Sequence, residues 1–188
     1  MPVLFARIPD DRVGVVIGHG GATKREIETE TRTAIEVDPV DGSVRISARD
    51  DDPMGAMKAR DIVLALGRGF SPERARRLLR DDTYLGIIDI RQVTGKRQKA
   101  AMWRIRSRLI GEHGRARERI EELSGASMSV QGGTVALIGQ ETQLERATRA
   151  VETVSATSLQ SSPVRWASRA RRVSARVRAP VLVSSAAS

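Results

Sequence analysis

The chain has 188 residues, of which 40% are hydrophobic, so it can bury the core of one or two small domains. Its formal net charge of +9 favours a polyanionic partner, either nucleic acid or an anionic membrane surface. No apolar run approaches the roughly 20 residues that span a bilayer, so we expect a soluble protein. The absence of cysteine excludes disulfides and thiolate chemistry and agrees with a cytoplasmic location.

The first half of the sequence predicts a strand, two helices, two strands and a helix. The strand covers residues 3–8, and the first helix covers residues 10–17, with Asp10 as its cap. A second helix, residues 21–31, follows a glycine turn. Strands at residues 33–37 and 44–48 meet at the turn Asp41-Gly42. The last helix starts after Asp50-Asp51-Asp52 at Pro53 and runs to about Leu66.

The segment after this helix, Gly69-Phe70-Ser71-Pro72-Glu73, predicts a hinge followed by a short helix through Leu79. The second half repeats the order of the first. It has a strand at 84–90, a longer first helix at 96–110, a second helix at 115–123, a hairpin of strands 127–130 and 134–138, and a helix at 141–154. The fold class is therefore α+β, with the order βααββα present twice.

Both halves can be aligned at a nearly constant spacing. At an offset of 93 residues, Ile17, Gly18 and Gly21 meet Ile110, Gly111 and Gly114. Further on the offset falls to 91, so that Val44 meets Val135 and Ile46 meets Leu137. A loop shortened by two residues explains the change, because surface turns tolerate deletions. This internal match indicates a duplicated domain.

Each half places a four-residue glycine turn before its second helix. The first amides of a helix lack partners within the helix and lie at the positive end of its dipole, which makes them a natural site for phosphate. Glycines at both ends of the turn let a nucleic-acid backbone approach closely. An apolar groove beside each turn is then expected to receive bases. Its predicted lining is Ile17, Ile27 and Ile35 in the first half, and Ile110, Ile120 and Met128 in the second.

The segments Ile17-Gly18-His19-Gly20-Gly21 and Ile110-Gly111-Glu112-His113-Gly114, each followed by helix, hairpin and helix, resemble the IGxxG core of type I KH domains. The resemblance covers about residues 1–156. It implies a module that clamps about four nucleotides of single-stranded nucleic acid across the turn. The residues expected to bind RNA are Ile17, Gly18, His19, Gly20, Gly21, Lys24, Arg25, Ile110, Gly111, Glu112, His113, Gly114, Arg115, Arg117 and Ile120.

The linker together with Gly125-Ala126-Ser127 and the run from Gly133 to Gly139 resembles archaeal KH proteins related to the small-subunit assembly factor called partner of Nob. That resemblance implies binding near the 3′ end of small-subunit ribosomal RNA during its maturation. It also implies two protein partners: the nuclease that trims this end and the alpha subunit of translation initiation factor two.

The sequence departs from the usual KH pattern in two respects, and its tail departs from that of the partner-of-Nob relatives, which usually end in a charged helix with acids among the bases. Glu112 stands inside the second turn, where KH loops often carry a cation, so we expect Arg115, Arg117 and Arg119 to supply the positive charge there. Lys24 and Arg117 stand where an apolar residue is usual. The tail from residue 158 has no acid and carries Arg165, Arg169, Arg171, Arg172, Arg176 and Arg178, with Trp166 among them. We expect this tail to fold on binding RNA.

Other functions remain as alternatives. A protein-interaction scaffold would bind partners without salt dependence, and a small ribonuclease would use His19 or His113 as acid or base. Neither histidine has ligand partners at metal-binding spacing, and the first turn lacks the spacing of a nucleotide-binding loop. We therefore expect no enzyme activity, no metal and no cofactor. Trp103 is expected to pack in a core or a domain interface.

The expected domain organisation has four parts. The first KH domain covers residues 1–68, and a linker with a short helix covers 69–82. The second KH domain covers 83–157, and the arginine-rich tail covers 158–188.

Overall fold

The computed structural model describes residues 3–49, 52–91 and 99–159, in two halves of the same architecture. The first half contains β1 (Val3–Arg7), α1 (Asp10–Ile17), the 3₁₀ turn η1 (His19–Gly21), α2 (Ala22–Thr31), β2 (Thr33–Val37), β3 (Ser43–Ala48) and α3 (Pro53–Gly67). The second contains β4 (Tyr84–Asp89), α6 (Lys99–Ile110), the 3₁₀ turn η3 (Glu112–Gly114), α7 (Arg115–Ser124), β5 (Ser127–Gln131), β6 (Thr134–Gly139) and α8 (Glu141–Leu159). The predicted order βααββα is confirmed in both halves.

Each half forms a three-stranded antiparallel sheet with the last strand in the middle. The orders are β1-β3-β2 and β4-β6-β5. Outer strand β1 alternates between exposed and half-buried residues, as expected for a sheet with one face in water. Every residue of β6 is buried instead, which shows that both faces of the second sheet are covered.

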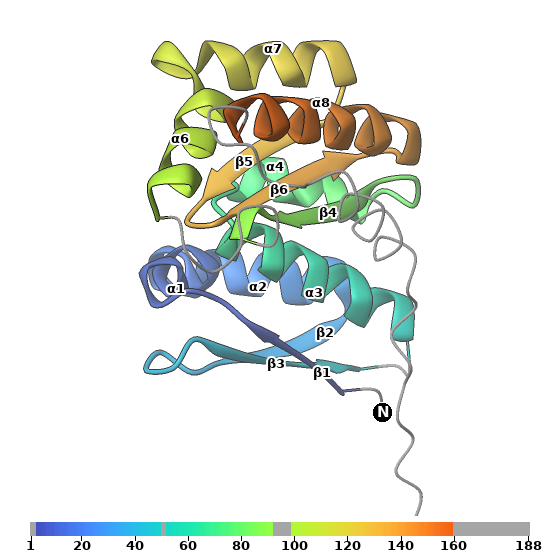
Figure 1. Cartoon of the computed structure of the whole chain (residues 1–188). Coiled ribbons are helices and arrows are strands. Elements are labelled where there is room, and N and C mark those ends of the chain that lie inside the picture. The colour runs from blue at the N-terminus through green and yellow to red at the C-terminus, as the bar shows by residue number, and fades with distance from the viewer. Residues whose placement is uncertain (1–2, 50–51, 92–98, 160–188) are drawn as a thin grey trace, which may run out of the picture.

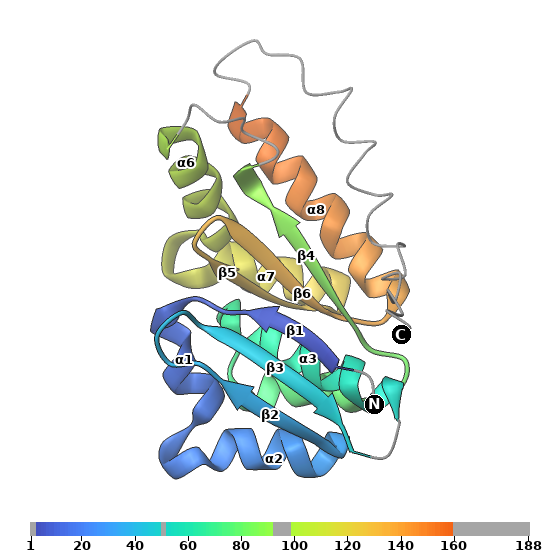
Figure 2. The same cartoon turned by 90° about the horizontal axis from the view of Figure 1, so that it is seen from below.

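The molecule has four alternating layers, in which the helices of the first half lie between the two sheets (Figure 1). Seen from below, the first sheet lies in front of α3, with α1 and α2 beside it (Figure 2). The second sheet covers the other side of these helices, because Ala136 and Ile138 of β6 belong to the same buried cluster as Ile62 and Leu66 of α3. A second cluster, including Ile105, Leu109 and Met128, lies between the second sheet and its own helices. The two halves therefore share apolar surface.

The predicted hinge after α3 is a packed connection. Phe70 is 1% exposed, its amide donates to Ala65, and its carbonyl accepts from the Arg12 guanidinium at 2.9 Å. A Cβ at Gly69 would lie 2.7 Å from Ser129 Oγ of β5, so the two halves meet closely here. The hinge prediction is wrong because Gly69 serves a close contact, which a sequence pattern cannot distinguish from freedom to bend. The short helix after it is confirmed, as α4 (Pro72–Ala75) and η2 (Arg76–Leu79), with Ser71 as the cap.

One predicted helix cap is wrong and another is confirmed. The residue before α1 is Pro9, and Asp10 lies inside the helix without capping it. Asp52 caps α3 as expected, because its Oδ1 accepts from the amides of Met54 at 3.0 Å and Gly55 at 3.1 Å. Pro53 occupies the first helical position, where its missing amide costs nothing.

Some predicted features lie outside the described residues. These are Asp50, Asp51, the start of the helix predicted from Lys96, and the tail from residue 160, with Trp166 and its six arginines. The described helix α8 continues to Leu159, beyond the predicted end at Val154. Among the described residues, no helix is long and apolar enough to cross a membrane. The four domain ranges remain predictions.

Asp61 of α3 gives the fold a pH-dependent component. Burial raises the pKa of this carboxyl, and the Arg60 guanidinium 3.0 Å away opposes the shift only in part. A raised folded-state pKa means that the folded state binds the proton more tightly than the unfolded state, so stability is lost as pH rises through that pKa. We expect Asp61→Asn to raise the melting temperature at neutral pH and to differ less from the parent at acidic pH. A pH-independent difference in thermal melts would contradict this.

Candidate nucleic-acid interface

The two glycine turns have the same backbone conformation. In the first, φ is +74° at Gly18, +55° at Gly20 and +80° at Gly21. In the second, φ is +72° at Gly111, +52° at His113 and +82° at Gly114. Positive φ therefore occurs at the first, third and fourth places of each turn, even where the second copy has histidine instead of glycine. The turns match in backbone geometry as well as in sequence. Helices α1 and α6, which lead into them, lie on the same side of the molecule (Figure 1).

The first glycine of each turn is required by the fold itself. A Cβ at Gly111 would lie 2.7 Å from Ala116 N and 2.6 Å from Ala116 Cβ. A Cβ at Gly18 would lie 2.7 Å from Thr23 N. The glycine thus lets the last turn of one helix touch the first turn of the next.

The last glycine of each turn is approached by side chains alone. Around the Cβ position of Gly114 the nearest atoms are Glu118 Oε1 at 3.9 Å and Arg117 Nη2 at 4.0 Å. At Gly21 the nearest is Arg25 Nη1 at 3.3 Å. No backbone atom approaches from outside, so another molecule's backbone has room to reach this point. Each turn has an arginine beside its last glycine, Arg117 in the second turn and Arg25 in the first. A guanidinium group suits phosphate.

The helices that follow the turns present free donors. No side chain of the described residues caps α2 or α7. The amides of Gly114 and Arg115 are used within the second turn, donating to Gly111 and Glu112. The remaining first-turn amides of α7 keep the positive end of the helix dipole unneutralised by a cap.

Arg117 places a guanidinium beside the second turn, with its Nη2 4.0 Å from the Cβ position of Gly114. Its Nε is buried and has no hydrogen-bond partner among the described residues. Arg115 and Arg119 are exposed, and Arg119 pairs with Glu122 at 3.3 Å. In the first turn Lys24 pairs with Glu28 at 3.7 Å, which leaves Arg25 as its nearest unpaired cation in the described chain.

Glu112 stands at the exposed tip of the second turn, with 83% of its side chain accessible. Its carboxylate opposes any phosphate that approaches the turn. We expect Glu112→Lys to tighten RNA binding about two- to fivefold at low salt, because exposed charge contacts contribute about 1 kcal/mol or less. The measurement is a fluorescence-anisotropy titration with single-stranded RNA. Glu145→Lys, the same charge change at an exposed position of α8, is the control and should change the affinity less.

Most of the predicted groove lining is core. Ile27, Ile35, Ile120 and Met128 are 3%, 1%, 8% and 0% exposed. Only Ile17 and Ile110, at the ends of α1 and α6, are half-buried. An apolar residue beside a turn can line a groove or a core, and burial decides between them. Ile120 is therefore placed to support α7 rather than to offer surface to RNA. Both turn histidines, His19 and His113, are exposed as a ligand contact requires.

Trp103 corrects another prediction. It is 69% exposed on α6 rather than packed in a core or an interface. Ala101, Ile105 and Leu109 are the buried face of this helix, and Trp103 lies two residues beyond Ala101, about 200° around it. The sequence did not decide this, because Trp103 shares its helix face with Ile110, seven residues on, and two apolar residues on one face suit a core as well as a surface.

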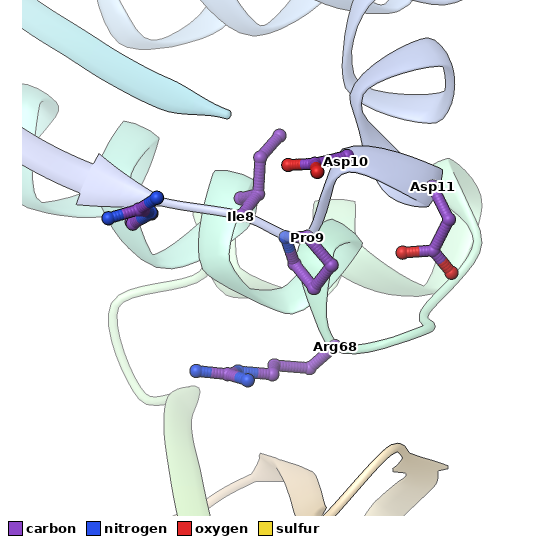
Figure 3. A pocket seen from close by; sticks show the side chains of 6 residues that line it. Ile8, Pro9, Asp10, Asp11 and Arg68 are labelled. Atoms are coloured by element: carbon purple, nitrogen blue, oxygen red, sulfur yellow. The ribbon is translucent and has the colours of Figure 1, made fainter. Parts of the chain in front are cut away.

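An open hollow lies on the first half near the junction, away from the turns. Arg7, Ile8, Pro9, Asp10, Asp11 and Arg68 line it (Figure 3). Its cations and carboxylates are mixed, and it contains none of the predicted RNA-binding residues. The glycine turns therefore remain the candidate interface.

Comparison with known proteins supports this reading of both halves. A KH domain family model matches residues 4–63, and a model of a second PNO1 domain, described as a eukaryotic-type KH domain (KH-domain type I), matches residues 84–172. A KH domain-containing protein of Methanocaldococcus jannaschii is 44% identical over 148 residues, which cover 78% of this chain and 64% of that protein. The match thus spans less than two thirds of that relative's length.

Solved structures agree over more of the chain. Dim2p from Pyrococcus horikoshii is 48% identical with a TM-score of 0.77, over 82% of this chain and 91% of that one. Dim2p in a complex with a/eIF2alpha and rRNA, from the same organism, is 45% identical with a TM-score of 0.77, over 93% of each chain. A protein of unknown function from Aeropyrum pernix is 34% identical with a TM-score of 0.78. With both halves matched as KH domains at this level of identity, the chain belongs to the family of tandem KH-domain proteins that includes archaeal Dim2p and PNO1.

Proposed function

We propose that this protein binds single-stranded RNA through its second glycine turn and acts in the maturation of the small ribosomal subunit. The observation that carries the proposal is the turn itself. Gly114 opens outward at the start of an uncapped helix, and Nη2 of Arg117 lies 4.0 Å from its Cβ position. A phosphate would satisfy both the amides and the guanidinium.

The second turn is the better clamp of the two. Its following helix begins Arg115-Ala116-Arg117, whereas the first turn is followed by Lys24, which already pairs with Glu28. The residues proposed to contact RNA there are Ile110, Gly111, His113, Gly114, Arg115 and Arg117. The first turn, with His19, Gly20 and Arg25, would add a second, weaker contact.

The RNA and the protein partner are proposed from relatives. A Pyrococcus Dim2p has been solved in a complex with a/eIF2alpha and rRNA, and it aligns with 93% of this chain. We propose that this chain likewise binds the 3′ region of small-subunit rRNA and the alpha subunit of translation initiation factor two. The nuclease that trims this end is a further proposed partner, and the KH family's usual role is binding rather than catalysis.

The test is a competition titration with the full chain. Labelled RNA matching the 3′ end of small-subunit rRNA is displaced by the same RNA or by an unrelated single strand of equal length. We expect the matching RNA to compete at least about tenfold better, and the affinity to fall as salt rises because phosphate binding releases counterions. Equal competition would reject the rRNA assignment, and affinity without salt dependence would reject phosphate clamping.

A further inference from the structure

Helix α6 continues the candidate interface beyond the glycine turn. Trp103, Ser107 and Ile110 follow one another at spacings of four and three residues, so they lie along one face of the helix. Ile110 directly precedes Gly111, and Ser107 and Trp103 are exposed. Ala101, Ile105 and Leu109 on the opposite face are buried, and Ile105 and Leu109 belong to the second core. The exposed face therefore leads from the turn to the indole without interruption by packed residues.

The distance along this face suits a strand that the turn grips. Seven residues of helix place Trp103 about 10 Å from Ile110. Four stacked nucleotides cover a similar length, about 10 Å at a rise of 3.4 Å per step. A strand clamped over about four nucleotides and continuing along α6 would bring its next base to the indole.

The surroundings of Trp103 are cationic. Helix α6 has no acidic residue, and its exposed side chains include Arg104, Arg106 and Arg108. An exposed aromatic among arginines, next to a backbone clamp, is the composition of surfaces that bind single-stranded nucleic acid. Docking of a protein helix would need several apolar neighbours, whereas the position between Trp103 and Ile110 on this face is Ser107.

We propose that Trp103 stacks on an RNA base adjacent to the nucleotides that the second glycine turn clamps. The inference rests on the proposed function, since the turn must first hold the strand. Stacking recognises the aromatic face of a base rather than its edge, so this subsite would add affinity with little sequence preference and favour purines for their larger surface.

The experiment uses the full chain carrying Trp166→Phe, which leaves Trp103 as its one tryptophan. Titration with a single-stranded heptanucleotide should quench its fluorescence. Trp103→Ala should weaken binding about fivefold or more, since stacking on one base increases affinity by at least roughly a factor of five. Trp103→Phe should restore part of the loss. Phe5→Ala removes another exposed aromatic, on β1 of the first sheet, and should leave the affinity unchanged.

The outcomes separate this inference from the proposed function. If Trp103→Ala binds RNA like its parent and no quenching occurs, while changes in the glycine turn still abolish binding, the stacking subsite is wrong and the clamp stands. If Trp103→Ala impairs binding of the initiation-factor alpha subunit but not of RNA, Trp103 is a protein contact and the inference is overturned. If the parent chain does not bind RNA, both fail. Circular dichroism confirms that each variant is folded.

Discussion

Gly111→Ala is expected to lower the free energy of unfolding by about 3 kcal/mol or more. Gly111 has φ +72° and ψ 178°, a region that is essentially restricted to glycine and costs other residues roughly 1–3 kcal/mol. The new Cβ would also meet Ala116 N at 2.7 Å, and a backbone atom at the start of a helix cannot move away alone. The second turn and the start of α7 must therefore shift together.

Gly114→Ala is the matched control for this loss. Its φ of +82° and ψ of 1° lie in the left-handed helical region, and no atom lies within 3.9 Å of the new Cβ. The cost should be about 1 kcal/mol, from backbone strain alone. Urea unfolding of both variants measures the difference. Equal losses of stability would contradict the assigned roles, in which the first glycine serves packing and the last serves access.

Arg117→Gln is expected to weaken RNA binding at least about tenfold. Nη2 of the guanidinium lies 4.0 Å from the Cβ position of Gly114, so a phosphate at the turn would accept a hydrogen bond from this group. Hydrogen bonds to charged groups contribute about 1.5–3 kcal/mol, which corresponds to this loss. Glutamine keeps part of the aliphatic stem and removes the charge. The slope of log affinity against log salt concentration should also become shallower, by about the amount that one phosphate contact contributes.

Arg119→Gln makes the same change in charge two residues further along α7. Arg119 is exposed and pairs with Glu122, away from the turn. We expect a loss of affinity well below that of Arg117→Gln. If the two variants weaken binding equally, RNA is attracted by the overall positive charge of the surface, and Arg117 makes no specific contact.

The order of elements could be predicted because local chemistry marks it. Asp52 and Pro53 signal the start of α3, Ser71 and Pro72 signal α4, and Gly125 ends α7 in the left-handed conformation. Each of these signals acts within one helical turn, so the sequence alone contains it. The repeated glycine turns then define both halves, and the structure confirms their matching backbone.

Burial was the part that the sequence could not decide. Phe70 follows a glycine in what resembles a hinge, yet it is buried in the first core because the second half packs over α3. Ile120 and Met128 recur at helical and strand spacings that suit a groove or a core equally, and the fold places them in the core. Trp103 shows the reverse error, since a large aromatic residue was expected inside. Long-range packing decides all three cases, and neighbouring residues carry no record of it.

The site prediction is accordingly strongest for the turns. Backbone conformation at Gly18, Gly21, Gly111 and Gly114 follows from their residue type and spacing. How much each turn is expected to contribute to RNA binding depends on which of its cations already have partners. Lys24 pairs with Glu28, and Arg117 has a buried Nε without a partner in the described chain. These side-chain contacts depend on the three-dimensional fold and do not follow from the sequence.

The central claim is that the second glycine turn clamps RNA by its backbone. The most direct test titrates RNA matching the 3′ end of small-subunit rRNA with two variants of the full chain. One carries Glu112→Asp with His113→Asp, and the other carries His19→Asp with Gly20→Asp. Both keep the outer glycines and place two aspartates between them, which adds one negative charge to the second turn and two to the first. Our account predicts that the second-turn variant loses at least about tenfold in affinity while remaining folded, and that the first-turn variant loses less. Unchanged affinity in the second-turn variant would contradict it.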